Sequence, residues 1–254
     1  MRWGIIGFGR IGRRLEQRLP GAAAILLRPG QGAVAQPVAC TTIEALIAAR
    51  PDVAIECASA PALAEYGPKL LAAGIDLVPL SLTALAEPAV ERRLLAAAET
   101  GPGRLEIAPG AIGTLDLLAA AREEGLQRVV YRQIKSPAMW RLTPAAALAD
   151  LASIEERQVF FRGSVRDVAR RMPGNLNTSV GVALAGLGLD GTEAELVADP
   201  AISETAHELE VYAAPGKAML KVGGRDVAPD GDPVDYTTFS LMRILKRRLA
   251  RVMI

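Results

Sequence analysis

The sequence has very few histidines and cysteines, the side chains that build most zinc sites and all disulfides. Its 254 residues include one histidine, His207, and two cysteines, Cys40 and Cys57. A structural zinc site needs about four Cys or His ligands, and the two cysteines lie far apart in unrelated contexts. We therefore expect no metal, no disulfide framework and a reducing compartment, the cytoplasm. Any acid–base chemistry by an imidazole has to come from His207.

The chain also lacks an excess of charge of either sign and a long apolar run. Its 29 Lys and Arg side chains are offset by 28 Asp and Glu, which gives no reason to expect nucleic acid or a membrane as partner. No apolar run reaches the roughly 18 residues needed to span a bilayer. Residues 1–7 run into a strand pattern without the features of a signal peptide.

The first part of the chain alternates short apolar runs with helix-like stretches. This alternation is typical of βαβ units, and it predicts an α/β fold with an N-terminal Rossmann domain over residues 1–110. The sheet should be doubly wound and parallel. Its strands are expected at residues 3–6, 24–27, 53–57, 75–80 and 105–108.

The later part of the chain predicts a second, mixed α/β domain over residues 111–235. Short turns connect the last expected strands, which favours a mixed or antiparallel sheet. The strands are expected at 128–135, 158–162, 193–197, 207–212 and 218–222, and buried and basic helices at 177–189 and 237–253. We expect the C-terminal segment 236–254 to pack back on the first domain.

A glycine motif, Gly7-Phe8-Gly9-Arg10-Ile11-Gly12, follows the first expected strand and opens the first expected helix. Gly7 permits a tight turn, Gly9 lets a pyrophosphate approach the backbone, and Gly12 lets the helix pack closely on the strand. Backbone N–H groups at the helix N-terminus then favour the phosphates. Arg10 and Ile11, inside the loop, are expected cofactor contacts. The alternative is a glycine-rich turn without a ligand.

The second expected strand lacks the acidic residue that grips the adenosine ribose in NAD-specific Rossmann domains. Leu27-Arg28-Pro29 stands at that place. Arg28 is available to pair with a 2′-phosphate, so NADP should be tolerated. Alternatively, Arg28 stacks on adenine or faces solvent. The cofactor is therefore predicted as NAD or NADP.

Several segments together resemble the L-aspartate dehydrogenase family over essentially the whole chain. The most distinctive is Ala108-Pro109-Gly110-Ala111-Ile112-Gly113-Thr114-Leu115-Asp116. The other segments are 50–58, 161–166, 173–177, 183–192, 198–200 and 207–211.

The resemblance implies an NAD(P)-dependent oxidoreductase acting on a CH–NH2 group. Enzymes of this family reversibly oxidise L-aspartate to iminoaspartate, which hydrolyses to oxaloacetate and ammonia and can feed NAD biosynthesis. The family's catalytic histidine falls on His207, and its cofactor-contacting alanine and asparagine fall on Ala111 and Asn177. Ala58 and Ser59, in and after segment 50–58, are further expected cofactor contacts. The resemblance also implies that residues 111–235 form the catalytic and dimerisation domain. A homodimer is the implied assembly, and a small amino or keto acid is the implied substrate.

These positions also make physical sense. Small residues around Ala111, after the last expected strand of the first domain, leave room for a nicotinamide ring. Asn177 offers a donor and an acceptor at a helix start, and Asn175 is a candidate substrate contact. Alternatively, one of the two asparagines caps that helix. A histidine with an ordinary pKa near 6.5 suits proton transfer at neutral pH, unless His207 is a surface residue. Lys135 is a candidate to hold a substrate carboxylate, or is simply solvated.

The sequence departs from the family pattern at three places. Thr205 replaces an asparagine, Gly174 replaces a lysine, and residues 232–237 differ from a segment that carries a lysine. Because a dicarboxylate needs positive charge or N–H donors, these changes put the substrate in question. Two alternatives stay open: a Rossmann imine or carbonyl reductase with another substrate, and a non-catalytic nucleotide-binding regulatory protein.

Overall fold

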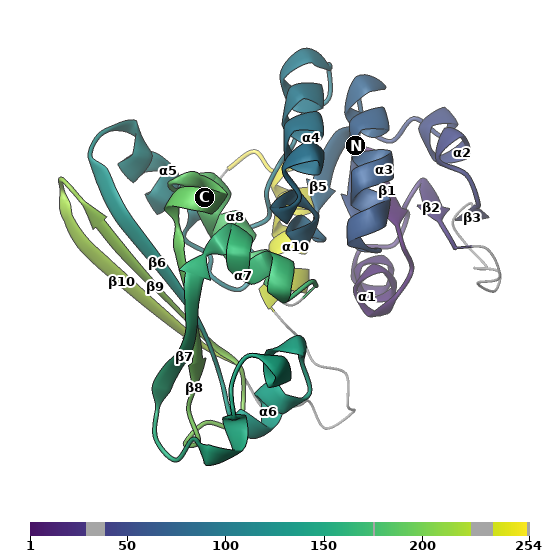
Figure 1. The fold of residues 1–254 in the computed structure, drawn as a ribbon. Helices are drawn as coiled ribbons and strands as arrows, with labels where there is room; N and C mark the ends of the chain where they lie inside the picture. Colours follow the sequence, from purple (N-terminus) through teal and green to yellow (C-terminus); the bar gives the residue numbers. More distant parts are fainter. Residues whose placement is uncertain (29–38, 175, 225–235, 253–254) are drawn as a thin grey trace. The chain divides into compact units, whose positions relative to one another are not determined.

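A computed structural model describes residues 1–28, 39–174, 176–224 and 236–252 of the chain. Its contacts divide the chain into two compact units, Met1–Ala108 with Thr237–Ile254, and Pro109–Tyr236. Each unit is built on one 5-stranded sheet (Figure 1). Among the described residues, no helix is both long and apolar enough to cross a lipid bilayer.

The sheet of the first unit is parallel, and its strand order is β3-β2-β1-β4-β5. The strands are β1 (Trp3–Ile6), β2 (Ala24–Leu26), β3 (Ala39–Cys40), β4 (Val53–Glu56) and β5 (Asp76–Pro79). The order changes direction between β1 and β4, and sheets of this kind bind ligands beyond the carboxyl ends of the strands at that point. The predicted Rossmann sheet is confirmed.

The helices of the first unit are α1 (Arg10–Arg18), α2 (Ile43–Ala48), α3 (Ala60–Ala72), η1 (Leu82–Ala86), α4 (Pro88–Thr100) and α10 (Tyr236–Arg247). The C-terminal helix α10 contributes Leu241, Ile244 and Leu245 to the same buried cluster as Trp3 and Ile5. Beyond α10, Arg248 forms an ion pair with Asp76 at 2.6 Å. Apolar packing and an ion pair therefore attach the end of the chain to the first unit.

The strand predicted at residues 105–108 does not form. Leu105 makes only an isolated parallel bridge to Leu77, in β5, and the residues after it are irregular. Pro102-Gly103 and Pro109-Gly110 bracket this apolar run and leave it too short to extend the sheet, because proline cannot donate to a ladder and glycine weakens a strand.

The sheet of the second unit has the order β10-β9-β6-β8-β7. Its strands are β6 (Leu126–Lys135), β7 (Gln158–Ser164), β8 (Glu193–Ala198), β9 (Ala206–Ala213) and β10 (Gly216–Gly223). Strands β6 and β8 are parallel, while the other pairs are antiparallel. The mixed sheet predicted from the sequence is confirmed.

The helices of the second unit are α5 (Leu115–Glu123), α6 (Pro137–Arg141), η2 (Pro144–Ala147), η3 (Leu151–Ser153), α7 (Val165–Arg171), α8 (Asn177–Ala185) and α9 (Gly188–Gly191). One helix was expected over residues 177–189, but the structure has two. The chain leaves helical geometry at Gly186, which has φ −102° and ψ −120°, and Gly188 then takes a left-handed φ of +77°. Two glycines so close together favour a break, because glycine alone adopts such conformations at little cost.

Side chains alternate between the two faces of this second sheet. Helices α5, α7 and α8 lie along one face (Figure 1), which we call the covered face. Residues directly opposite in register share a face, and the opposite pair Gln133 and His207 belongs to the covered face. The neighbouring pair Arg132 and Glu208 points to the other side, which we call the open face.

Candidate functional site

The glycine loop after β1 is open beside Gly9 and closely packed at Gly7 and Gly12. Gly7 has a left-handed φ of +89°, and a Cβ there would lie 2.7 Å from the Cβ of Ala58. A Cβ on Gly12 would lie 2.5 Å from the Gly7 carbonyl oxygen, whereas one on Gly9 would meet nothing within 4 Å. Gly7 and Gly12 are thus required by packing, and open space lies beside Gly9.

The other predicted cofactor residues of the first unit lie around the same carboxyl edge. Arg10 is the exposed first residue of α1. Ile11 packs against the core cluster of the unit. Arg28 is exposed two residues after β2 ends, and Ala58 and Ser59 follow β4. The parallel sheet thus brings these residues to one edge, because all its strands end there.

Glu56, the last residue of β4, is a buried carboxylate that the sequence analysis did not single out. It is fully buried and accepts hydrogen bonds from the N–H groups of Ala58 at 2.8 Å, Ser59 at 3.0 Å and Ser81 at 3.0 Å. The Ser81 hydroxyl donates to it at 2.9 Å. Burial raises the pKa of Glu56, and these four bonds oppose that shift.

Glu56 therefore fixes two loops at the carboxyl edge of the first sheet, the loop after β4 and the loop after β5. It also uses the N–H groups of Ala58 and Ser59, while the Ser59 hydroxyl caps α3 by accepting from Ala62 N at 3.3 Å. The sequence signal was an acidic residue inside the apolar run 53–57. A charge within a buried strand needs several donors, and small residues follow it here.

His207, in β9, lies on the covered face of the second sheet. Its Nδ1 is 2.7 Å from the hydroxyl oxygen of Tyr131, in β6, and the two rings are tilted with centroids 5.9 Å apart. The Thr178 hydroxyl, in the first turn of α8, lowers the pKa of the Tyr131 phenol, against the larger effect of burial. Two strands that are far apart in sequence therefore position one imidazole.

The surroundings of His207 favour its neutral form. Burial lowers the pKa of His207 to about 4, and the positive charge of Lys135 lowers it further in the same direction. Gln133 lies directly opposite His207 in the sheet. Its side chain is buried, and its oxygen has no hydrogen-bond partner among the described residues. At neutral pH the imidazole is uncharged and can accept a proton.

Lys135, at the end of β6, is half-buried near His207. Its ammonium nitrogen lies 4.9 Å from the centroid of the Trp140 ring, a distance suited to a cation–π contact. Burial lowers the pKa of Lys135. Within the described part of the chain, the ion pairs leave Lys135 without a carboxylate partner. The Lys135 ammonium could therefore bind an anion that comes from outside the protein.

The turn at Pro109–Gly113 lies beside the start of α8. Gly110 and Gly113 have left-handed φ values of +56° and +69°, and a Cβ on Gly110 would be 3.8 Å from the Thr178 hydroxyl oxygen. Ala111 is therefore brought near the helix that begins with Asn177. Asn175, the asparagine predicted to contact substrate, lies outside the described residues.

No group of three or more potential His, Cys, Asp or Glu ligands is found in the parts of the chain that the structure describes. Cys40 and Cys57 are free thiols. Burial raises the pKa of Cys57, as does the charge of Glu56, so Cys57 is a poor nucleophile and a poor metal ligand.

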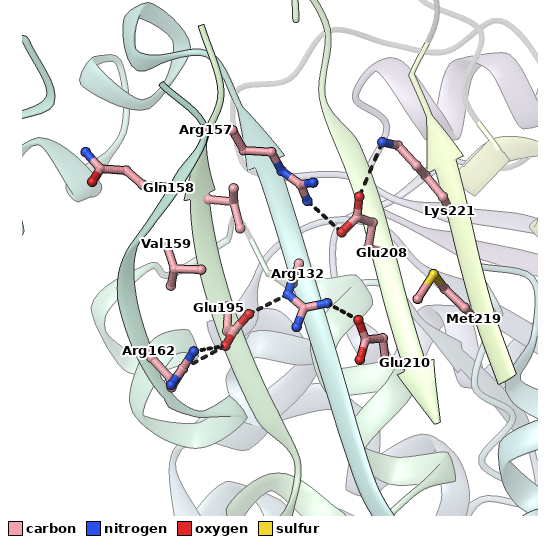
Figure 2. A pocket seen from close by; sticks show the side chains of 11 residues that line it. Arg132, Arg157, Gln158, Val159, Arg162, Glu195, Glu208, Glu210, Met219 and Lys221 are labelled. Atoms are coloured by element: carbon pink, nitrogen blue, oxygen red, sulfur yellow. Dashed lines mark hydrogen bonds and ion pairs between the residues drawn. The ribbon is translucent and has the colours of Figure 1, made fainter. Parts of the chain in front are cut away.

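A groove of about 500 Å³ runs along the open face of the second sheet, opposite to His207 (Figure 2). Opposite charges are paired across its strands. Glu195 contacts Arg132 at 2.5 Å and Arg162 at 2.6 Å, and Glu208 contacts Arg157 at 2.7 Å. The charged side chains that line this groove are already paired with one another. The groove is therefore better suited to contact another protein surface than to catalyse a reaction.

Comparison with known proteins gives two family matches. Residues 116–248 match the family described as aspartate dehydrogenase, C-terminal. Residues 7–108 match the family described as homoserine dehydrogenase, NAD binding domain. The division between these two matches falls near the boundary between the two structural units.

Similar proteins are known in sequence and in structure. L-aspartate dehydrogenase of Serratia proteamaculans is 36% identical over 251 residues, which cover 96% of this chain and 95% of that protein. L-aspartate dehydrogenase of Cupriavidus necator is 42% identical over 205 residues, which cover 81% and 77%. The crystal structure of aspartate dehydrogenase from Thermotoga maritima shares the fold, with a TM-score of 0.82, 24% identity and coverage of 100% and 99%.

The family predicted from the sequence is thus confirmed, and so are the Rossmann fold and a nicotinamide dinucleotide as cofactor. The chain belongs to the L-aspartate dehydrogenase family of NAD(P)-dependent oxidoreductases.

Proposed function

We propose that the protein catalyses the reversible NAD(P)-dependent oxidation of L-aspartate to iminoaspartate, with His207 as the group that moves protons. The observation that carries this proposal is a neutral, half-buried imidazole on the covered face, bonded to Tyr131 at Nδ1 and flanked by an ammonium group. The names and coverage of the similar proteins support L-aspartate as the substrate.

The glycine loop fits the cofactor. A pyrophosphate needs space close to the backbone, and the open space beside Gly9 offers it at the N-terminus of α1. Backbone N–H groups there would hold the phosphates. Arg10, Ile11 and the loop at Ala58 and Ser59 would border the cofactor. Ala111 and Asn177 stay proposed cofactor contacts from the second unit. When bound, the nicotinamide ring supplies the acceptor for a hydride.

His207 handles the proton that accompanies hydride transfer. The hydrogen on the aspartate Cα leaves with two electrons, a C=N bond forms, and the substrate nitrogen loses one proton. Water then adds to the imine carbon and loses a proton before ammonia leaves. A neutral imidazole can accept either proton and return it in the reductive direction.

Lys135 is proposed to hold one carboxylate of the substrate. Its ammonium is positioned by Trp140, and an anion next to it would form a charge-assisted hydrogen bond. Such an anion would also cancel the charge that lowers the pKa of His207. Substrate binding would therefore make His207 a stronger base when it is needed. Asn175 stays a proposed substrate contact outside the described residues.

Turnover measurements test the proposed activity. We expect reduction of NAD or NADP with L-aspartate, and the reverse reaction with oxaloacetate, ammonia and the reduced cofactor. His207→Ala should abolish turnover while NADH still binds, as measured by quenching of its fluorescence. Activity with another amino acid but not with L-aspartate would change the assigned substrate. Gly174 and Thr205, where the sequence departs from the family pattern, make this outcome worth testing. Absence of turnover with any amino or keto acid would contradict the enzymatic proposal in favour of a regulatory protein.

Arg28 is proposed to let the enzyme accept NADP. A guanidinium–phosphate hydrogen bond is worth roughly 1.5–3 kcal/mol, so Arg28→Asp should raise the KM for NADP about 10-fold or more and leave the KM for NAD nearly unchanged. Arg18→Asp, at the exposed end of α1, is the matched control. An unaltered KM for NADP in Arg28→Asp would contradict this role.

We propose the domain assignment predicted from the sequence: residues 1–110 with 236–254 bind the dinucleotide, and 111–235 form the catalytic and dimerisation domain. The division of contacts after Ala108 supports it. The cytoplasm stays the proposed location, supported by two free thiols in the structure.

A homodimer is proposed to form through the open face of the second sheet. An interface with two-fold symmetry has to be complementary to itself, and this face pairs acidic with basic side chains around the exposed apolar residues Val159 and Met219. Met219→Glu should therefore shift the sedimentation of the protein from dimer to monomer. Leu142→Glu, exposed elsewhere in this unit, should leave it unchanged. A wild-type monomer, or an unaffected dimer in Met219→Glu, would contradict this interface.

A further inference from the structure

Strand β4 lies between β1 and β5 in the first sheet, and the residues at its end bond to loops on both sides. The carboxylate of Glu56 accepts from the N–H of Ser81, in the loop after β5, at 3.0 Å. The thiol of Cys57, the next residue, donates to the carbonyl oxygen of Gly7, in the loop after β1, at 3.2 Å. Two adjacent side chains therefore connect three loops at the carboxyl edge, where sheets of this kind bind nucleotides.

Cys57 holds the glycine loop from its inner side. Its sulfur would lie 3.4 Å from a Cβ on Gly12, and that Cβ would lie 2.5 Å from the Gly7 carbonyl oxygen. The same sulfur makes a longer contact of 3.5 Å with the carbonyl oxygen of Ile6. The first and last glycines of the motif thus pack around one thiol, while the space beside Gly9 stays open for a ligand.

The two oxygens of Glu56 serve different loops. Oε1 accepts from the N–H groups of Ala58 at 2.8 Å and Ser59 at 3.0 Å, and from the Ser81 hydroxyl at 2.9 Å. Oε2 accepts from the Ser81 N–H. Glu56 is fully buried, whereas Ala58 and Ser59 are exposed. The carboxylate therefore fixes the backbone of residues at the edge without facing a ligand itself.

Stability alone is a weak reason for such a carboxylate. Removing a charge from water is costly, and its partners offset that cost without a large surplus. The donors to Glu56 belong to loops beyond the strands, so its bonds determine the shape of those loops. A site whose loops are already ordered binds its ligand more tightly, because less conformational freedom is lost on binding.

We propose that the end of β4 preorganises the two halves of the dinucleotide site separately, with Cys57 fixing the glycine loop for the pyrophosphate and Glu56 fixing the loop after β5 for the nicotinamide half. A dinucleotide lies across a sheet of this kind, with its adenosine on the side of β2 and its other half on the side of β4 and β5. Both side chains are positioning residues. The inference concerns the cofactor and not the amino acid substrate.

Two ligands separate the two halves. ADP carries the adenosine and the pyrophosphate, whereas NADH carries the nicotinamide half as well. NADH binding to the full-length protein is followed by its fluorescence, and ADP binding by displacement of NADH. If the wild type prefers NADPH, both ligands carry the 2′-phosphate. Neither measurement needs turnover, so the outcome is independent of whether L-aspartate is the substrate.

Glu56→Gln tests the nicotinamide half. The amide keeps most bonds when its oxygen takes the place of Oε1 and its NH2 group faces the Ser81 N–H, because two donors cannot bond to each other. The loop after β5 is then released, while Ala58 and Ser59 stay bonded. We expect the Kd for NADH to rise about 10-fold and the Kd for ADP to stay within about 2-fold of the wild type.

Two further variants accompany Glu56→Gln. Ser81→Ala removes only the hydroxyl bond and should raise the Kd for NADH by a smaller factor, and it decides the question if Glu56→Gln does not fold. Asp76→Asn is the matched control, because Asp76 begins β5 at the opposite edge of the sheet and accepts from the Arg104 N–H at 2.8 Å. It should change neither Kd.

Cys57→Ala tests the glycine loop. Loss of the thiol donor should raise the Kd for ADP and for NADH by the same factor, about 3- to 10-fold for one hydrogen bond of ordinary strength. Cys57→Ser keeps a donor and should restore both values. Cys40→Ala removes a buried thiol that donates to the Ile25 carbonyl oxygen at 3.4 Å, and both Kd values should stay unchanged.

Unchanged NADH binding in folded Glu56→Gln would overturn the inference. An equal loss of ADP and NADH binding in that variant would also overturn it, because Glu56 would then not act on one half. Unchanged ADP binding in Cys57→Ala would remove Cys57 from the site. A lower Tm with unaltered Kd values in both variants would mean that the two side chains serve only the fold.

Discussion

The two faces of the second sheet are made by the same strands and differ sharply in how they treat charge. On the open face, Arg132, Glu195 and Glu208 take part in ion pairs near solvent. On the covered face, His207 and Lys135 are half-buried, and burial is the main cause of the lowered pKa of each. A half-buried titratable group without a partner of opposite charge is a candidate catalytic or binding residue. Charges that are paired with one another instead stabilise the fold or contribute to protein–protein contacts.

The first expected effect concerns stability on the open face. Glu195 is 1% exposed and is the shared partner of Arg132 and Arg162. Glu195→Gln removes the charge between two guanidinium groups. Arg132 keeps Glu210 as a partner and the Arg162 side chain is 64% exposed. The free energy of unfolding should therefore fall by roughly 1.5–3 kcal/mol, the contribution of a hydrogen bond to a charged group. Lys221→Met removes an exposed partner of Glu208 and should cost under about 1 kcal/mol. Equal losses in urea denaturation would erase the distinction between buried and exposed pairs.

On the covered face, His207 should make stability depend on pH. Its folded pKa of about 4 lies below the ordinary value of 6.5, so the unfolded chain takes up the proton first as the pH falls. The contribution is complete above pH 6.5 and is lost as the pH falls to 4, by about 3 kcal/mol at 1.36 kcal/mol per pKa unit. His207→Asn lacks this titration. As the pH falls from 6.5 to 4, the wild type should therefore lose stability relative to the variant, and the difference between their free energies of unfolding should narrow. Parallel pH curves for the two chains would show that His207 is not desolvated.

One lysine from each face can be compared for its effect on substrate binding: Lys135 on the covered face and Lys221 on the open face. Lys135→Met should raise the KM for L-aspartate roughly 10- to 100-fold, because a charge-assisted hydrogen bond is worth about 1.5–3 kcal/mol. Lys221→Met should leave it nearly unchanged, since the charge of Lys221 faces Glu208 on the open face. Initial-rate kinetics measure both, and a similar KM in Lys135→Met and the wild type would remove Lys135 from the substrate site.

The smallest effect expected is on the titration of the imidazole itself. Because the Lys135 charge helps to lower the pKa of His207, Lys135→Met should raise that pKa from about 4 toward 6.5. The 15N signals of the single histidine follow the titration directly. In Lys217→Met, which carries the change on the exposed strand β10, the pKa should stay where it is. No rise in Lys135→Met would mean that burial alone sets the value.

Local pattern was sufficient for much of the fold. The strands that end near Gly7 and at Glu56 are predicted because they are short apolar runs followed by glycine or small residues. In the structure both strands are buried on both faces. The run at 105–108 has the same apolar character but gains only one bridge, at Leu105. The predicted helix over 177–189 breaks near Gly186 and Gly188. In both cases backbone geometry at glycine and proline outweighed apolar periodicity.

The candidate site was only partly accessible from the sequence. His207 stood out because it is the only histidine and lies in a segment that resembles a known family. Glu56 was overlooked because its partners, at Ser81 and in the loop of Ala58, are defined by hydrogen bonds between loops. Tyr131 was overlooked because nothing local in a strand shows which neighbour its hydroxyl will meet.

The sequence by itself determined the order of strands and helices, the glycine loop and the family, because periodicity and motifs depend on neighbours along the chain. Only the tertiary structure decided that Tyr131 and Lys135 lie close to His207, and that the alternate residues of the same strands form a neutralised open face. Strand register and helix packing bring together residues 76 positions apart in the chain, such as Tyr131 and His207. Distances of that kind depend on the packed core as a whole.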